Sequence, residues 1–220
     1  MAPTCIIALA ALALTAPSPS RAQQEKAAGW SIELYTGSAA SVPTRLTIQQ
    51  SGFEDIRMTA HYATRPWTGA PYYAFRIGRW NRGRAWELEL VHHKLYLTNP
   101  PPEIQNFEVT HGYNLITVNR AVLYGGVIAR VGVGAIVVHP EASVHGQPLI
   151  DTKGNLGRGY SLTGPTLQIA AQKRIVLWRQ LFLGLEGKVT GSYARFSVTG
   201  GSATVPNVAL HGLLGFGWGI

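Results

Sequence analysis

The chain of 220 residues has little charge, one cysteine and no long apolar run in its body. Charged residues make up 14% of it, against about 25% in an ordinary soluble domain. The cysteine, Cys5, lies in a short apolar segment at the start. After that segment, no run reaches the ~18 apolar residues that indicate a membrane-spanning helix. A disulfide framework, a cysteine metal site and a bundle of transmembrane helices are therefore excluded.

The first 22 residues have the pattern of a secretory signal. A short apolar core over residues 5–15 is followed by small residues that end at Ala22. Such a core is too short to span a bilayer, and small residues after it are typical of a cleavage site. We expect cleavage after Ala22 and an exported mature domain over residues 23–220. A short N-terminal anchor helix is the alternative.

The formal net charge is +8. A basic balance suits either nucleic acid or anionic lipid headgroups, and in an exported chain we expect lipid rather than nucleic acid. Seven cations gather near the expected short turns, either as a solvated surface or as a basic collar against anionic phospholipids. They are Arg79, Arg82, Arg84, Arg120, Lys173, Arg174 and Arg179.

Apolar and polar residues alternate along most of the chain after Ala28. In residues 181–198, Leu183, Leu185 and Val189 share one face, and Glu186 and Lys188 share the other. A period of two is typical of a β-strand with two different faces. The pattern predicts eight strands, at 29–37, 71–80, 84–97, 106–119, 123–138, 159–173, 179–198 and 205–220.

The connections between these strands alternate in length. Short turns are expected near 81–83, 120–122 and 174–178, and longer Pro-, Gly- and Ser-containing segments at 38–70, 98–105, 139–158 and 199–204. Within the first long segment, two strand-like runs, 43–50 and 55–63, predict a hairpin that projects from the barrel. Short turns at one end and long loops at the other are typical of an outer-membrane barrel. An even strand count places both termini at the short-turn end.

Alternation alone does not decide which face points outward, since a soluble lipocalin-like barrel has the same period. Glycine and small residues on the polar face suit a narrow interior, and the strands reach the ~9–11 residues that a tilted membrane strand needs. Aromatic residues near both strand ends predict two interfacial belts. The short-turn belt comprises Trp30, Trp80, Trp86, Tyr124, Trp178 and Trp218, and the long-loop belt comprises Tyr35, Tyr72, Tyr73, Tyr96, Tyr160 and Tyr193. We therefore expect the apolar face to meet lipid.

Residues 29–220 resemble the small eight-stranded outer-membrane proteins, a class that includes the OmpA transmembrane domain, OmpX, PagP and PagL. The hairpin spacing, the aromatic belts and the alternating C-terminal segment LHGLLGFGWGI carry the resemblance. In that class the last strand normally ends in an aromatic residue, whereas this chain ends in Ile220, with Phe216 and Trp218 just before it.

The resemblance implies an all-β fold: an antiparallel, eight-stranded, up-and-down transmembrane β-barrel with an extended first outer loop. It implies the outer membrane of a Gram-negative bacterium, reached through the secretory pathway. The implied partners are lipopolysaccharide, anionic phospholipids and the outer-membrane assembly machinery. The implied role is structural or surface-interactive, and a soluble lipocalin-like lipid carrier is an alternative.

Polar residues on the inward face predict a buried network of ion pairs, because buried charges must be paired to be tolerated. A gated pore or proton path is the alternative, but eight strands leave an interior barely wide enough for side chains, so we expect no open pore. The predicted set is Glu33, Arg76, Glu87, Glu89, His93, Glu108, Arg130, Gln168, Glu186, Lys188 and His211.

The histidines suggest a second candidate site. If the Pro-rich loop turns symmetrically about residues 101–102, His92 lies opposite His111 on the lipid-facing side. PagL-type enzymes place a His-Ser-Glu set on the outer surface of a barrel, which implies a lipid A acyl hydrolase with His92 or His111 as the catalytic residue. Two residues after these histidines, however, stand Lys94 and Tyr113 rather than serine. Ser161, on another strand, could take the role only if the fold brought it close.

The alternative for His92 and His111 is an interfacial pair that contacts lipid phosphates. A metal site is not expected, because the adjacent residues His92 and His93 point to opposite faces of a strand and cannot share one ion. The sequence indicates no cofactor.

Overall fold

The computed structural model describes residues 28–148, 155–157 and 159–219. The expected signal segment and Ile220 lie outside these ranges. The described residues form thirteen strands. Among them, no helix is long and apolar enough to cross a membrane.

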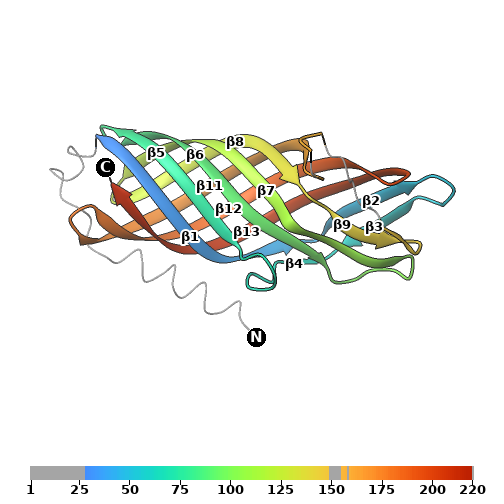
Figure 1. The fold of residues 1–220 in the computed structure, drawn as a ribbon. Helices are drawn as coiled ribbons and strands as arrows, with labels where there is room; N and C mark the ends of the chain where they lie inside the picture. The colour runs from blue at the N-terminus through green and yellow to red at the C-terminus, as the bar shows by residue number, and fades with distance from the viewer. Residues whose placement is uncertain (1–27, 149–154, 158, 220) are drawn as a thin grey trace.

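Eight of the strands form a closed antiparallel ring (Figure 1). Each strand pairs with the next, and the last pairs with the first, Ser31 opposite Gly219. The predicted eight-stranded antiparallel barrel is confirmed. The ring consists of β1 (Gly29–Val42), β5 (Tyr73–Asn81), β6 (Arg84–Leu97), β7 (Ile104–Tyr124), β8 (Val127–Val138), β11 (Ser161–Trp178), β12 (Leu181–Val198) and β13 (Gly201–Gly219).

The alternating pattern places apolar side chains outside the ring and charged ones inside it. In β12, Glu186 and Lys188 are buried, whereas Val189 on the opposite face is 40% exposed. Leu210, which pairs with Val189 across β12 and β13, is 57% exposed. The orientation is therefore that of a barrel with an apolar exterior, and the inverted arrangement of a soluble carrier does not fit it.

Tight two-residue turns join the strands at the end of the barrel where β1 begins and β13 ends. Arg82 and Gly83 join β5 to β6 with φ values of 48° and 71°, and Gly125 and Gly126 join β7 to β8 with 57° and 80°. Positive φ at both central residues is the geometry that suits the twist of a β-hairpin.

Two of the expected short turns were misplaced. The turns expected at 120–122 and 174–178 lie instead at Gly125–Gly126 and at residues 179–180. The strands continue through the earlier positions, because a hairpin turn forms where positive φ is accessible. Arg120 and Arg174 consequently lie on strands rather than in turns.

At the other end of the barrel, five shorter strands continue or border its wall (Figure 1). They are β2 (Thr44–Gln50), β3 (Ile56–Ala60), β4 (Tyr62–Ala63), β9 (Glu141–Val144) and β10 (Gln147–Pro148). The expected hairpin in 38–70 is β2–β3, and β2 pairs with residues 201–204 of β13. The expected long connection 199–204 is a two-residue turn, because Gly200 adopts a φ of 73° and β13 begins at once. We call the part formed by these strands and the ends of β6, β7, β12 and β13 the outer extension.

A register shift interrupts the pairing of β6 with β7. His93 pairs with Tyr113, but Leu95 pairs with Val109, so β7 carries extra residues between these two positions. Gly112 lies in this bulge with a φ of 118°, a conformation that glycine adopts without strain. The expected pairing of His92 with His111 is therefore wrong, and His92 pairs with Asn114.

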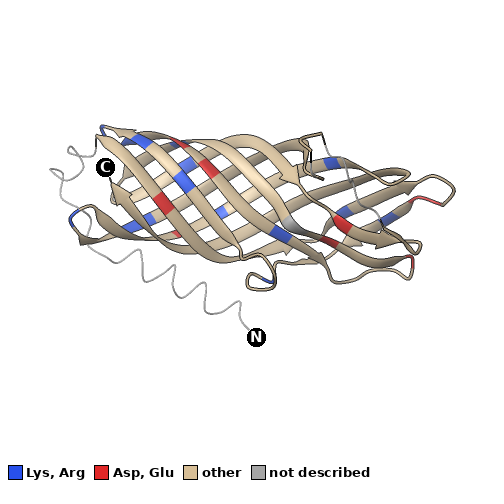
Figure 2. Cartoon of the chain, viewed as in Figure 1, with Lys and Arg blue, Asp and Glu red and all other residues tan. Residues whose placement is uncertain are grey.

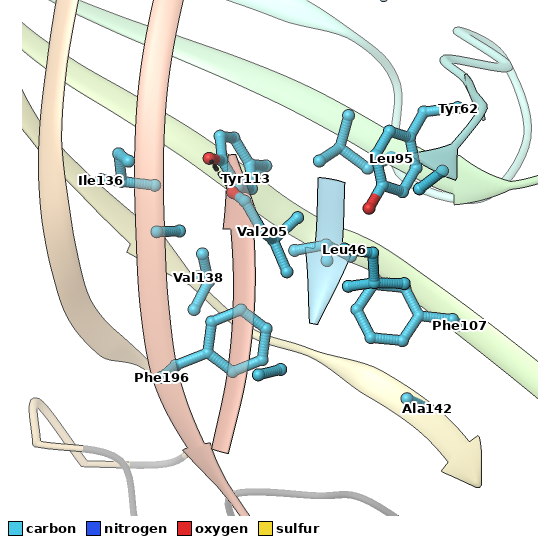
Figure 3. Packing of buried hydrophobic residues seen from close by; sticks show 14 of the residues in the cluster. Leu46, Tyr62, Leu95, Phe107, Tyr113, Ile136, Val138, Ala142, Phe196 and Val205 are labelled. Carbon is cyan, nitrogen blue, oxygen red and sulfur yellow. Dashed lines mark hydrogen bonds between the residues drawn. The ribbon is translucent and has the colours of Figure 1, made fainter. Parts of the chain in front are cut away.

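The interior is divided into a charged part and an apolar part. Figure 2 shows acidic and basic positions side by side on neighbouring strands of the ring. In the outer extension the inward side chains are instead apolar. Figure 3 shows Leu46 of β2, Phe107 and Tyr113 of β7, Phe196 of β12 and Val205 of β13 converging. This apolar interior was not foreseen from the sequence.

The aromatic belt at the short-turn end is largely as expected. Trp30, Trp86, Tyr124, Trp178 and Trp218 are exposed on the outer face. Trp80 is an exception, because it points inward and donates from Nε1 to Ser31 Oγ at 3.1 Å.

The belt expected at the long-loop end is wrong for half of its six tyrosines. Tyr35, Tyr72 and Tyr96 are buried, and only Tyr193 is more than half exposed. Tyr35 has the same parity as Glu33, so the alternation that turns Glu33 inward turns Tyr35 inward too.

Candidate functional site

Eight charged side chains meet inside the ring and form what we call the ion-pair layer. They come from six different strands: β1, β5, β6, β8, β11 and β12. All but one have fully buried side chains. The layer consists of Glu33, Arg76, Glu87, Glu89, Arg130, Arg174, Glu186 and Lys188.

Arg76 is the centre of the layer. Its Nη2 donates to Glu89 Oε1 at 2.7 Å and to Glu186 Oε2 at 2.8 Å. Its Nη1 donates to Glu33 Oε2 at 3.3 Å, and its Nε lies 3.8 Å from Glu87 Oε2. One guanidinium therefore contacts all four carboxylates of the layer, as its several N–H donors permit.

Arg130 makes the second set of contacts. Its Nε and Nη2 donate to the two oxygens of Glu87 at 2.7 and 3.2 Å, a bidentate pair. Its Nη1 donates to Glu186 Oε2 at 3.1 Å, and Nη2 also donates to Gln172 Oε1 at 2.6 Å. Bidentate geometry adds orientation as well as energy, so Arg130 fixes the relative positions of β6, β8 and β12.

Lys188 and Arg174 complete the charge balance. Lys188 Nζ donates to Glu89 and lies 3.3 Å from Glu186 Oε1, and Arg174 Nη2 donates to Glu33 Oε1 at 2.7 Å. The layer thus holds four cations and four carboxylates. A balanced and hydrogen-bonded set of this kind is the condition under which buried charge is tolerated.

The sequence placed Arg174 among the cations near the short turns, either solvated or in a basic collar, and that placement is wrong because Arg174 pairs with Glu33 inside the ring. Arg174 lies within β11, two residues after the buried Gln172, and its side chain points into the ring. Parity with Gln172 was the signal that could have found it, and the misplaced turn obscured that signal.

Neutral side chains satisfy the remaining oxygens of the carboxylates. Gln168 Nε2 and Asn119 Nδ2 donate to Glu89 Oε2 at 2.6 and 2.9 Å. Tyr35 Oη donates to Glu33 Oε2 at 2.5 Å, and Gln172 Nε2 donates to the same oxygen at 2.9 Å. These contacts leave the centre of the ring occupied by side chains rather than open.

Glu108 does not belong to the layer, contrary to the sequence-based prediction. It is only partly buried and pairs across strands with Tyr96 and Glu141 in the outer extension. It has the opposite parity to Phe107, Val109 and Tyr113, which point inward on both sides of the bulge at Gly112. The inward side chains of this part of β7 are apolar, so taking the polar face as the inward one reversed the orientation of the strand.

His211 is buried but lies beyond the ion pairs rather than among them. Its Nδ1 lies 2.7 Å from Tyr72 Oη, and its Nε2 lies 2.8 Å from Thr190 Oγ1. The ring centroid of His93 is 5.0 Å away, and His93 Nε2 lies 3.3 Å from Asn207 Oδ1. A layer of neutral polar groups therefore borders the apolar interior of the outer extension.

His92 lies on the outward side, as the sequence suggested, but with other neighbours. Its Nδ1 lies 2.8 Å from Asn114 Oδ1, and its ring stacks on Tyr73 with centroids 5.1 Å apart. The side chain of His111 lies outside the part of the chain that the structure describes. Ser161 pairs with Val138 on β8, and β7 and β8 separate its strand from that of His92.

A closed ring of eight antiparallel strands, apolar outside and filled with ion pairs inside, is the architecture of the small outer-membrane β-barrel proteins. No family model and no curated protein matches the chain.

Solved structures of such proteins match most of the chain. Neisserial surface protein A is 10% identical, with 88% of this chain and 98% of that chain covered and a TM-score of 0.44. The outer membrane protein AlkL, solved in DMPC bilayers, is 11% identical, with coverages of 92% and 94% and a TM-score of 0.49. OprG from Pseudomonas aeruginosa is 10% identical, with coverages of 90% and 98% and a TM-score of 0.43. The fold assignment rests on the strand ring and not on these likenesses.

Proposed function

We propose that the protein is an integral outer-membrane barrel, closed to solutes, whose role is structural or surface-interactive. The observation that carries the proposal is the outward apolar surface around a filled interior. Exposed aliphatic side chains cover the ring on several strands, for example Leu34, Leu88, Val133 and Ile169 at 52–60% exposure. A soluble protein rarely exposes so wide an apolar surface, whereas a lipid-embedded barrel requires one.

The partners we propose follow from this placement. Lipopolysaccharide and anionic phospholipids would surround the barrel, and the outer-membrane assembly machinery would insert it. The outer extension would present a rigid surface beyond the membrane. The full interior argues against transport of solutes through the ring.

Reconstitution into lipid vesicles tests the proposal. We expect the protein to float with the vesicles in a density gradient and to add no single-channel steps in a planar bilayer, because the ion-pair layer occupies the ring. An open porin serves as the positive control for conductance. Recovery of the protein in the soluble fraction would contradict the membrane assignment, and stable conductance steps would contradict the closed interior.

The lipid A hydrolase alternative receives a separate test. A hydrolytic histidine needs a nucleophile to activate and a carboxylate to orient it, and Ser161, the serine considered for this role, lies on a strand that β7 and β8 separate from the strand of His92. We expect cells producing His92→Ala or His111→Ala to have the same lipid A acylation as cells producing the parent protein. Mass spectrometry of lipid A is the measurement. A change in acylation on either substitution would instead favour the hydrolase.

A further inference from the structure

The connection between β4 and β5, which we call the strap (Thr64–Tyr72), is held against the outer side of the barrel by Lys94. His93 and Leu95 belong to the interior, so Lys94 between them points outward. It is nevertheless fully buried. Its Nζ donates to the carbonyl oxygens of three strap residues, Arg65 at 3.3 Å, Ala70 at 2.8 Å and Thr68.

Further contacts fix the shape of the strap. The hydroxyl of Tyr96 donates to Thr68 O at 3.3 Å. Within the strap, the Thr68 amide donates to Arg65 O at 3.2 Å and the Tyr72 amide donates to Pro66 O at 2.8 Å. The strap is therefore an ordered element lying on β6 rather than a free loop.

The strap presents Trp67, which is 69% exposed. The chain has six tryptophans. Four of them are exposed near the short-turn end, namely Trp30, Trp86, Trp178 and Trp218, and Trp80 points inward. Trp67 is thus the tryptophan at the opposite end of the barrel, where three of the six tyrosines of the expected belt are buried.

The height of the strap matches a membrane interface. Lys94 follows Trp86 by eight residues on β6, which is about 27 Å along a strand at ~3.4 Å per residue. A strand tilt of about 35–45° reduces this to roughly 20 Å along the barrel axis, close to the ~25 Å height of the apolar band of a membrane barrel. If Trp86 marks one interface, the strap lies near the other.

Arg65 supplies a charge at the same level. Its side chain is exposed, and its guanidinium lies 4.8 Å from the centroid of the Tyr96 ring. Among the residues that the structure describes, no carboxylate lies within ion-pair distance of Arg65. An exposed guanidinium and an exposed indole two residues apart on one short segment are the combination that anchors proteins in an anionic headgroup layer.

We propose that the strap is a lipid-binding element of the outer interface, with Trp67 among the upper acyl chains and Arg65 against the phosphate of an anionic lipid. The proposal rests on the membrane assignment made above and adds the site and the lipid chemistry to it. Trp and Tyr favour this depth because they combine an apolar ring with a polar group.

Nitroxide labels test the depth of the strap. In the full chain with Cys5→Ser, single cysteines replace Trp67, Leu34 or Glu54, and each labelled protein is placed in phosphatidylcholine vesicles with or without phosphatidylglycerol. Collision with oxygen and with a water-soluble nickel chelate then reports the depth of each label. We expect the label at 34 deep in lipid, the label at 54 in water and the label at 67 between them.

The outcomes separate the two proposals. If the label at 34 lies in lipid but the label at 67 is as accessible to the nickel chelate as the label at 54, the strap proposal is overturned and the membrane assignment stays intact. A label at 34 in water overturns both. For the charge, we expect phosphatidylglycerol to reduce the mobility of the label at 67 and Arg65→Gln to abolish that response; an equal response in the variant removes the phosphate contact from the proposal.

Discussion

Replacing Arg76 by methionine is expected to lower the free energy of unfolding by about 3–5 kcal/mol, the cost of leaving buried carboxylates without their partner. Methionine is shorter but unbranched and apolar, so the change removes the charge and the donors and keeps much of the aliphatic stem. Glu33, Glu89 and Glu186 would each lose a contact of 3.3 Å or less. Urea unfolding of the reconstituted barrel, followed by tryptophan fluorescence, is the measurement.

Arg57→Met is the matched control. Arg57 donates to Asp55 at 2.8 Å, but its side chain is 58% exposed. Pairs of that kind contribute only about 0–1 kcal/mol. A second variant, Arg76→Met with Glu89→Gln, also removes one of the carboxylates left without a partner. Its loss in free energy of unfolding should be smaller than the sum of the losses of the two single variants. Equal losses in free energy of unfolding for Arg76→Met and Arg57→Met would show that the ion-pair layer does not stabilise the ring.

Placing an arginine on the outer face at Leu34 is expected to destabilise the barrel in lipid by about 2–4 kcal/mol, the cost found near the midplane of a membrane barrel. Leu34 is 58% exposed and pairs with Phe216 and Phe75, both of which are also exposed. It lies four residues from Trp30 on β1, which is about 10 Å of height for a tilted strand. Urea unfolding of the protein in lipid vesicles measures the decrease in the free energy of unfolding.

Leu156→Arg is the control for this change, since Leu156 has the same 58% exposure but lies in the connection before β11. A substitution at an exposed site in water usually changes stability by less than about 0.5 kcal/mol. The difference between the two variants therefore measures the surroundings of Leu34 rather than its exposure. A small loss at both positions would place the apolar face in water and contradict the proposed function.

Local alternation was sufficient to predict the ring and most of the ion-pair layer. Glu33, Arg76, Glu87, Glu89, Arg130, Glu186 and Lys188 could be assigned to the interior because each lies in a strand whose opposite face is aliphatic. Period two is a local property, and it survives as long as the strand is uninterrupted.

The errors arose where the inward face is not the polar one and where a strand end was misplaced. Glu108 was misplaced because the inward side chains of β7 in the outer extension are apolar, and Arg174 because the strand continues beyond the expected turn. Tyr35 and Tyr72 were assigned by their position near strand ends, although side-chain parity decides which way a residue points. The strap could not be foreseen, because it depends on one lysine reaching three backbone carbonyls of a distant segment.

The hairpin of β12 and β13 ends in the two-residue turn at Thr199 and Gly200. Its first strand has 18 residues, which at ~3.3 Å per residue and a tilt of about 40° corresponds to a rise of roughly 45 Å. An apolar band of about 25 Å would leave some 20 Å of paired strand standing above the lipid. A molecule that approached this end from outside the membrane would then meet stiff paired strands, whose binding loses little conformational entropy.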